Sequence, residues 1–232
     1  MNSYNYLDLL SELGINSAHP GGMERTSNML ADEPIQKGMK VLDVGCGTGE
    51  TSLFLKNNYQ CKVHALENHP VMLQKAKERV KNESDIEVIE GSIENMPFSD
   101  HTYDYIICES VLVFVHVKKA LDECFRVLKK NGTFIMNEMA ITNVLDESSL
   151  NRFKEFYCVT ELNNKEQWKN KMLQAGFKRV EEMYVESITS EQVSINLSPD
   201  IDPSILELLD QHQKLQQEFE RKIGHVIYSC CK

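Results

Sequence analysis

Apolar segments and amphipathic segments alternate along the first 140 residues of the chain. Each apolar segment has the length and composition of a buried strand, and each amphipathic segment carries apolar residues at helical spacing. The sequence predicts strands at 39–44, 61–66, 86–89, 103–108 and 133–136, and helices at 51–57, 71–80 and from about 120 to Asn131-Gly132. Such alternation indicates a parallel sheet covered by helices on both faces.

The last 90 residues follow a different pattern. A helix is expected at 165–175, a long strand at 177–188, an amphipathic helix from Ile205 to Ile223, and a closing strand at 225–230. The single tryptophan, Trp168, lies in the first of these helices and is expected in the core.

Composition narrows the class of protein. The 232 residues suit one large domain, and the formal net charge of −10 argues against nonspecific binding of nucleic acid. No signal peptide is visible, and the longest clean apolar run, 111–115, is far too short to span a bilayer. The seven cysteines include no C-x-x-C pair, which favours reduced thiols, a cytoplasmic location and no metal site.

The most informative segment is Val41-Leu42-Asp43-Val44-Gly45-Cys46-Gly47-Thr48-Gly49. A strand that passes into a helix through glycines exposes bare backbone to a ligand. The glycines are spaced G-x-G-x-G rather than G-x-G-x-x-G, and an acid precedes them. A buried carboxylate is unfavourable beside a pyrophosphate and favourable beside an ammonium group. The spacing therefore disfavours a dinucleotide ligand.

This segment resembles the first motif of the class I S-adenosylmethionine (SAM)-dependent methyltransferases. The resemblance implies an α/β three-layer sandwich, with a mostly parallel seven-stranded sheet, an antiparallel C-terminal hairpin strand and helical lid segments. It implies one domain over 1–232, comprising an N-terminal cap at 1–38, a SAM-binding core at 39–140 and substrate-lid segments with the antiparallel strands at 141–232. Cofactor contacts are implied for Asp43, Gly45, Cys46 and Gly47.

Further cofactor residues follow the next strands. Glu67, with Asn68 beside it, lies about 20 residues after the glycines, where an acid accepts hydrogen bonds from ribose hydroxyls; the alternative is a solvated acid at a strand end. The segment beginning Gly91-Ser92-Ile93 resembles the family's G-D-A-E-x-L-P-F motif, in which the acid binds the adenine amino group and the next residue packs on the ring. Here Ser92 replaces the acid, and Ile93 can still pack on the ring.

The N-terminal segment contains His19-Pro20-Gly21-Gly22 followed by Met-Glu-Arg-Thr. A proline before two glycines is typical of a turn, and a simple connector is the plainest interpretation. The segment also resembles the G-G-x-x-x-T stretch of phosphoethanolamine-type and other small-molecule methyltransferases. That resemblance implies glycine amides near the carboxylate of the cofactor. Phe114 replaces a histidine that is usual in phosphobase enzymes, and no basic cluster for a phosphate is evident.

The candidates for contact with the methyl acceptor are His19, Glu109, Asn137 and Glu138. His19, Glu109 and Glu138 are the candidate catalytic residues, and Glu109 is also a candidate cofactor ligand. The alternatives are a loop hydrogen bond for His19, a helix cap for Glu109, and loop hydrogen bonding for the other two. The last two follow a strand at the carboxyl edge of the sheet, where open α/β folds bind ligands.

The predicted function is in-line transfer of a methyl group from SAM to an O, N, S or C atom of a small molecule, which leaves S-adenosylhomocysteine (SAH). A methyltransferase of proteins or nucleic acids is one alternative, and a non-enzymatic SAM- or SAH-binding partner protein is another. A monomer and a homodimer are both compatible with the sequence, and no membrane partner is expected.

The substitution His19→Ala tests the candidate base in the N-terminal segment. We expect the variant to fold normally and to turn over its substrate more slowly, because a loop histidine contributes little to the core. Steady-state kinetics with an identified acceptor measure the effect. Unaltered kinetics would show that His19 takes no part in the reaction.

Overall fold

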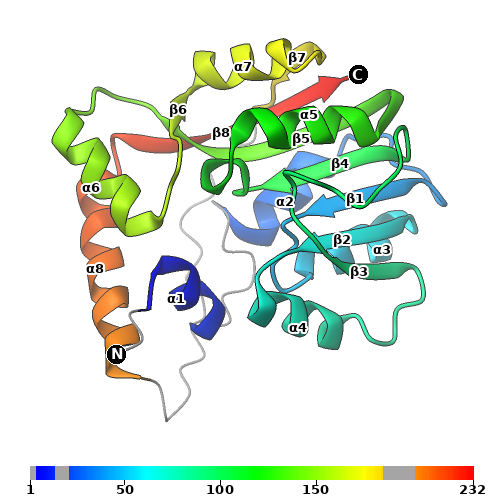
Figure 1. The fold of residues 1–232 in the computed structure, drawn as a ribbon. Coiled ribbons are helices and arrows are strands. Elements are labelled where there is room, and N and C mark those ends of the chain that lie inside the picture. Colours follow the sequence, from blue (N-terminus) through cyan, green and yellow to red (C-terminus); the bar gives the residue numbers. More distant parts are fainter. Residues whose placement is uncertain (1–3, 14–20, 185–201) are drawn as a thin grey trace.

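The computed structural model describes residues 4–13, 21–184 and 202–232, and a mixed β-sheet forms its centre (Figure 1). Within these residues the sheet has eight strands in the order β3-β2-β1-β4-β5-β8-β7, and the short β6 pairs with β5. The strands are β1 (Lys40–Val44), β2 (Lys62–Glu67), β3 (Ile86–Glu90), β4 (Tyr103–Glu109), β5 (Leu128–Ile141), β6 (Asn163–Asn164), β7 (Lys178–Glu182) and β8 (Ile223–Cys231).

The strands are parallel from β3 to β5, whereas β8 runs antiparallel to both β5 and β7. This arrangement confirms the predicted α/β fold with its antiparallel C-terminal strands. The carboxyl ends of β1, β2, β4 and β5 therefore meet at one edge of the sheet, which we call the carboxyl edge. Among the described residues, no helix combines the length and apolar composition needed to cross a bilayer.

Helices cover both faces of the sheet and one of its ends (Figure 1). They are α1 (Tyr6–Leu13), α2 (Gly22–Leu30), α3 (Glu50–Tyr59), α4 (Pro70–Arg79), the short 3-10 helix η1 (Leu112–Phe114), α5 (Val117–Val127), α6 (Glu147–Tyr157), α7 (Lys165–Gln174) and α8 (Pro203–Phe219). In Figure 1, α5 and α7 lie on one side of the sheet and α2, α3 and α4 on the other.

The core is divided by the sheet into two layers, because successive side chains of a strand point to opposite faces. In β1, Leu42 belongs to the layer under α5 and α7, and Val41 to the layer that includes α2. In β4, Ile106 and Ile107 divide in the same way. Trp168 is fully buried in the first layer, as expected, and its indole nitrogen donates to the Met139 carbonyl at 3.0 Å.

Three helices from distant parts of the sequence pack together beside the sheet. Helix α1 contacts both α6 and α8. Tyr6 of α1 lies edge-on to Tyr157 of α6, with ring centroids 4.7 Å apart, and 5.4 Å from the ring of His212 in α8. The N-terminal and C-terminal helical segments therefore form one continuous group of helices, visible at the left of Figure 1.

Strand β5 differs from its prediction. Helix α5 ends at Val127 rather than at Asn131-Gly132, and β5 begins at once with Leu128. The pairing with β4 then shifts register between Tyr103 and Tyr105, so Asn131 and Gly132 fall in an irregularity within the strand. Asn131 has a φ of +64°, which asparagine adopts more readily than most residues. The prediction that Asn131-Gly132 ends the helix was therefore wrong, because both residues lie inside β5.

The segment predicted as a long strand at 177–188 is only partly described. Strand β7 spans Lys178–Glu182, and the end of the predicted strand lies outside the described residues.

Candidate functional site

The connection from β1 to α3 is a tight turn built on three glycines. Gly45, Gly47 and Gly49 have φ angles of +63°, +56° and +82°, which glycine adopts without a steric penalty. A Cβ on Gly45 would lie 2.4 Å from a methyl group of Val111, whereas a Cβ on Gly47 would meet nothing within 4 Å. Gly45 thus allows close packing, and Gly47 leaves its backbone open to an approaching ligand.

Asp43 lies two residues before this turn and is almost fully buried. Its carboxylate accepts a hydrogen bond of 2.5 Å from the Ser52 hydroxyl. Burial raises the pKa of Asp43 to about 7; the Ser52 hydrogen bond opposes this shift, and the charges of Glu109 and Glu67 add to it. A carboxyl group in this state gains from a cation placed beside it.

Glu67 ends β2 and holds the same turn. It accepts hydrogen bonds from the backbone amides of Gly47 at 2.9 Å, Asn68 at 2.9 Å and His69 at 2.8 Å. A carboxylate has about four lone-pair positions, so these three bonds leave acceptor capacity for a ligand. The predicted cofactor residues Glu67 and Gly47 are therefore in direct contact, and Asn68 is exposed beside them.

Cys46 contributes backbone rather than thiol chemistry to the turn. Its amide donates to the Leu66 carbonyl at 3.1 Å, and its side chain is buried. Burial, with smaller contributions from Asp43 and Glu67, raises the pKa of the thiol well above its usual value. The group is a poor nucleophile in this state.

Glu109 ends β4 and connects the N-terminal segment to the glycine turn. Its carboxylate accepts from the hydroxyl of Thr26 at 2.9 and 3.2 Å and from the hydroxyl of Thr51 at 3.1 Å. Thr26 is the threonine of the G-G-x-x-x-T stretch, so that stretch contacts Glu109. Helix η1, which follows, has Val111 as its N-cap, so Glu109 does not cap it.

The two glycines of the N-terminal stretch begin α2. Gly21 and Gly22 have φ angles of +86° and +53°, and Gly22 is buried. His19 lies outside the described residues. Both glycines and His19 remain predicted site residues.

Ser92 and Ile93 follow β3 near Glu67, since the Gly91 amide donates to the Glu67 carbonyl at 3.0 Å. The Ser92 hydroxyl accepts from the Glu94 amide at 3.1 Å, and Ile93 is 4% exposed. The hydroxyl thus already has a local backbone partner. Contact of either residue with an adenine ring remains a prediction.

Glu138 and Asn137 are both fully buried in β5. Glu138 accepts hydrogen bonds of 2.6 Å from the amides of both Val111 and Leu112. These bonds lower its pKa, but burial has the larger effect and raises the pKa to about 8. The Asn137 carbonyl accepts from the Ser110 amide at 2.8 Å. These contacts hold the turn after β4, which makes Glu138 a positioning residue in this arrangement; its catalytic role stays a prediction.

Sequence reasoning missed the hydroxyl groups of the site. Thr26, Thr51 and Ser52 each donate to one of the acids. The threonine of the G-G-x-x-x-T stretch was a usable signal for Thr26. The other two begin a helix, where hydroxyl residues are common for local reasons, so their type alone carried no signal. Among the residues described, no group of three or more His, Cys, Asp or Glu side chains is arranged to hold a metal ion.

The substitution Glu138→Gln tests the electrostatic state of the buried carboxyl group. The unfolded chain loses this proton near the ordinary pKa of 4.5, whereas the folded chain keeps it up to about 8. Stability should therefore fall as the pH rises between these values and level off above them. We expect the wild type to lose roughly 4–5 kcal/mol relative to the variant across this window.

Thermal unfolding of both proteins at several pH values measures the difference. Glu78→Gln, at a glutamate whose side chain is 65% exposed, is the matched control and should follow the wild type. Parallel profiles for wild type and Glu138→Gln would show that Glu138 is ionised in the folded protein.

Comparison with known proteins agrees with the geometry. A family model described as a methyltransferase domain matches residues 35–221. The chain is 32% identical over 231 residues to the uncharacterized methyltransferase YodH of Bacillus subtilis (strain 168), covering 98% of this chain and 99% of that protein. It is 36% identical over 113 residues to the ubiquinone/menaquinone biosynthesis C-methyltransferase UbiE of Bartonella bacilliformis, covering 46% of this chain and 44% of that protein.

Among solved structures, phosphoethanolamine N-methyltransferase 2 of Haemonchus contortus in complex with S-adenosyl-L-methionine has the same fold. The TM-score is 0.79 at 19% sequence identity, and the match covers all of this chain and 58% of that chain. The family model covers most of the chain, and YodH aligns with nearly all of it. The chain therefore belongs to the class I SAM-dependent methyltransferases.

Proposed function

We propose that this protein transfers the methyl group of SAM to a small-molecule acceptor at the carboxyl edge of the sheet. The observation that carries the proposal is the convergence of Asp43, Glu67 and Glu109 on an open glycine turn. The charges of Glu67 and Glu109 both raise the pKa of Asp43. Each of these two carboxyl groups therefore lies close enough to interact with that of Asp43. An ammonium group and a sulfonium centre relieve the repulsion within such a cluster.

The residues of the turn fit this cofactor. Gly47 leaves open space over its backbone, and the buried Asp43 carboxyl group two residues before the turn is proposed to attract the ammonium group. Glu67 retains acceptor capacity for ribose hydroxyls. Ser92 and Ile93 are proposed to face the adenine ring, and the amides of Gly21 and Gly22 to face the carboxylate of the cofactor.

The bound cofactor supplies a methyl group that is already activated by the sulfonium. The protein has mainly to align the acceptor with it, and orientation alone can contribute about 7–11 kcal/mol to the lowering of a barrier. Glu109 serves this alignment, because its bonds to Thr26 and Thr51 hold α2 against the start of α3. Glu138 serves it indirectly by fixing the turn that follows β4.

A small acceptor is favoured over a macromolecule for two reasons. Helices α1, α6 and α8 pack together beside the sheet, and this group of helices suits an enclosed acceptor site. The net charge of −10 opposes a nucleic-acid substrate. UbiE and the Haemonchus contortus enzyme, whose names indicate small-molecule acceptors, are consistent with this choice.

The substitutions Asp43→Asn and Glu67→Gln test the cofactor site. Each removes a charge-assisted acceptor, which should weaken SAH binding about tenfold, or about 1–2 kcal/mol. Calorimetric titration with SAH measures the affinity. Asp104→Asn is the matched control, because Asp104 pairs with Lys129 away from the glycine turn and should leave the affinity unchanged. Unchanged affinity in a folded Asp43→Asn or Glu67→Gln protein would remove that residue from the site.

Transfer of a labelled methyl group from SAM into a cell extract tests the acceptor class. We expect label in the small-molecule fraction, because the proposed acceptor site is enclosed. The extract is separated into small molecules and macromolecules before counting, with Asp43→Asn protein as the control. Label confined to macromolecules would contradict the proposed acceptor class. SAH binding with no label in either fraction would favour the non-enzymatic alternative.

A further inference from the structure

Arg25 is a buried cation next to the proposed site. It lies in the first turns of α2 and is only 5% exposed. Its Nη1 donates to Nε2 of His225, which lies 200 residues later in β8. Because a guanidinium can only donate, Nε2 of His225 accepts, and the proton of the imidazole is on Nδ1.

The charge of Arg25 has no acidic counterpart within the described part of the chain. In that part, the arginines that form ion pairs are Arg79, Arg126 and Arg152, and the buried Nε of Arg25 has no hydrogen-bond partner. Burial lowers the pKa of Arg25. Burial, and then the charges of Arg25 and Lys165, lower the pKa of His225 to about 4, so the imidazole is neutral near pH 7. A neutral ring is a weak partner for a buried cation.

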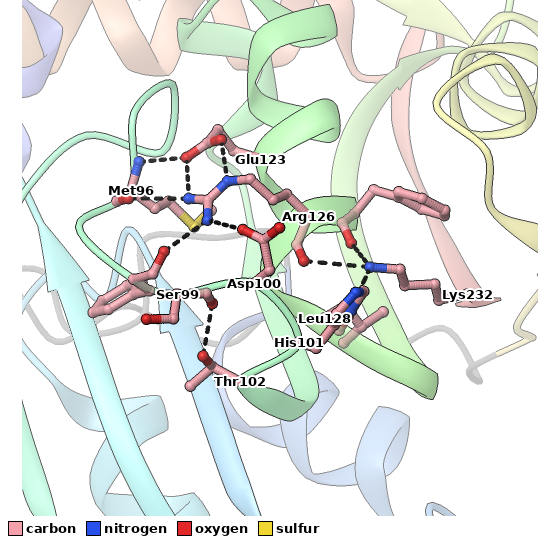
Figure 2. A network of polar contacts seen from close by, with 11 residues as sticks. Met96, Ser99, Asp100, His101, Thr102, Glu123, Arg126, Leu128 and Lys232 are labelled. Atoms are coloured by element: carbon pink, nitrogen blue, oxygen red, sulfur yellow. Dashed lines mark hydrogen bonds and ion pairs between the residues drawn. The ribbon is translucent and has the colours of Figure 1, made fainter.

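Arg126, an arginine away from the proposed site, has many hydrogen-bond partners and serves as a comparison (Figure 2). Its side chain is 31% exposed, yet it is surrounded by acceptors, and these raise its pKa. The partners are Glu123 at 2.7 and 2.8 Å, Asp100 at 2.8 Å, and the carbonyl oxygens of Phe98 at 2.7 Å and Met96 at 3.1 Å. The more buried Arg25 thus has much less compensation than the more exposed Arg126.

The position of Arg25 relative to the cofactor residues indicates what it faces. Thr26, the next residue, donates to Glu109 at the end of β4. Glu109 is paired with Asn137 of the neighbouring strand β5. Met139, two residues after Asn137, is paired with His225 of β8. The glycine turn follows β1, on the other side of β4. His225, and the guanidinium of Arg25 bonded to it, therefore lie beyond Glu109 from the glycine turn, which is the side that the proposed function leaves for the acceptor.

We propose that Arg25, held by His225, is the anion-binding group of the acceptor pocket, so that the methyl acceptor carries a carboxylate or phosphate group. The inference rests on the proposed function. An oxyanion would supply the charge that the described residues do not, and the Nε–H is a donor ready for it. Gly21 permits this arrangement, because a Cβ there would lie 2.0 Å from Nε.

The first test uses the wild-type protein saturated with SAH, so failure of the proposed function would appear separately as an absence of SAH binding. Sodium phosphate and sodium acetate are added, with sodium chloride at equal ionic strength as reference, and thermal unfolding is followed. Arg25→Met is measured under the same conditions. Subtracting its change in Tm from that of the wild type removes the general stabilisation by phosphate. We expect at least one oxyanion to raise the wild-type Tm more than that of the variant, and the more effective one identifies carboxylate or phosphate.

Two further measurements on Arg25→Met, the Tm without ligand and the affinity for SAH, distinguish an anion-binding role of Arg25 from a structural or cofactor-binding role. Without ligand, Arg25→Met should have an unchanged or higher Tm, whereas Arg126→Met, the matched control, should have a lower one. The affinity of Arg25→Met for SAH should stay within about twofold of the wild type. A tenfold loss of SAH affinity would assign Arg25 to the cofactor, and equal responses of wild type and variant to both oxyanions would overturn the proposal. Since the wild-type response needs no variant to fold, its absence alone overturns it.

Discussion

The site depends on one close approach, that of the glycine turn to the ends of two neighbouring strands. The Gly47 amide donates to Glu67 of β2, and Gly45 packs against Val111 after β4 with no room for a side chain. These contacts fix the start of α3, and with it the hydroxyls of Thr51 and Ser52 that hold Glu109 and Asp43. A substitution in the turn would therefore disturb both acids as well as the backbone.

Charge is distributed unevenly along the carboxyl edge of the sheet. Acidic groups gather around the glycine turn, where burial and mutual repulsion raise the pKa of Asp43. The cation Arg25 is held against a neutral His225 in β8, three strands from β1. A cationic cofactor and an anionic acceptor would each find a complementary charge at opposite ends of one site. Burial makes both arrangements costly in the absence of ligand, a common property of functional sites.

We assign different tasks to two buried acids of this protein: Asp43 is proposed to bind the cofactor, and Glu138 holds a turn of the backbone. Asp43 accepts from the Ser52 hydroxyl beside the open turn, whereas Glu138 uses one oxygen to hold the Val111 and Leu112 amides. Both have raised pKa values because of burial. A raised pKa by itself thus does not distinguish a ligand-binding acid from a positioning one, and the hydrogen-bond partners make the distinction.

The sequence by itself determined the order of strands and helices from β1 to β5, the glycine turn, and the roles expected of Asp43 and Glu67. Those features depend on local periodicity and on the rule that parallel strands end at one edge, so neighbouring residues encode them. Only the tertiary structure brought Thr26 to Glu109 and Arg25 to His225, because these partners are 83 and 200 residues apart. It also decided the register shift in β5. Such pairings follow from how helices pack on the sheet, and no local pattern records that packing.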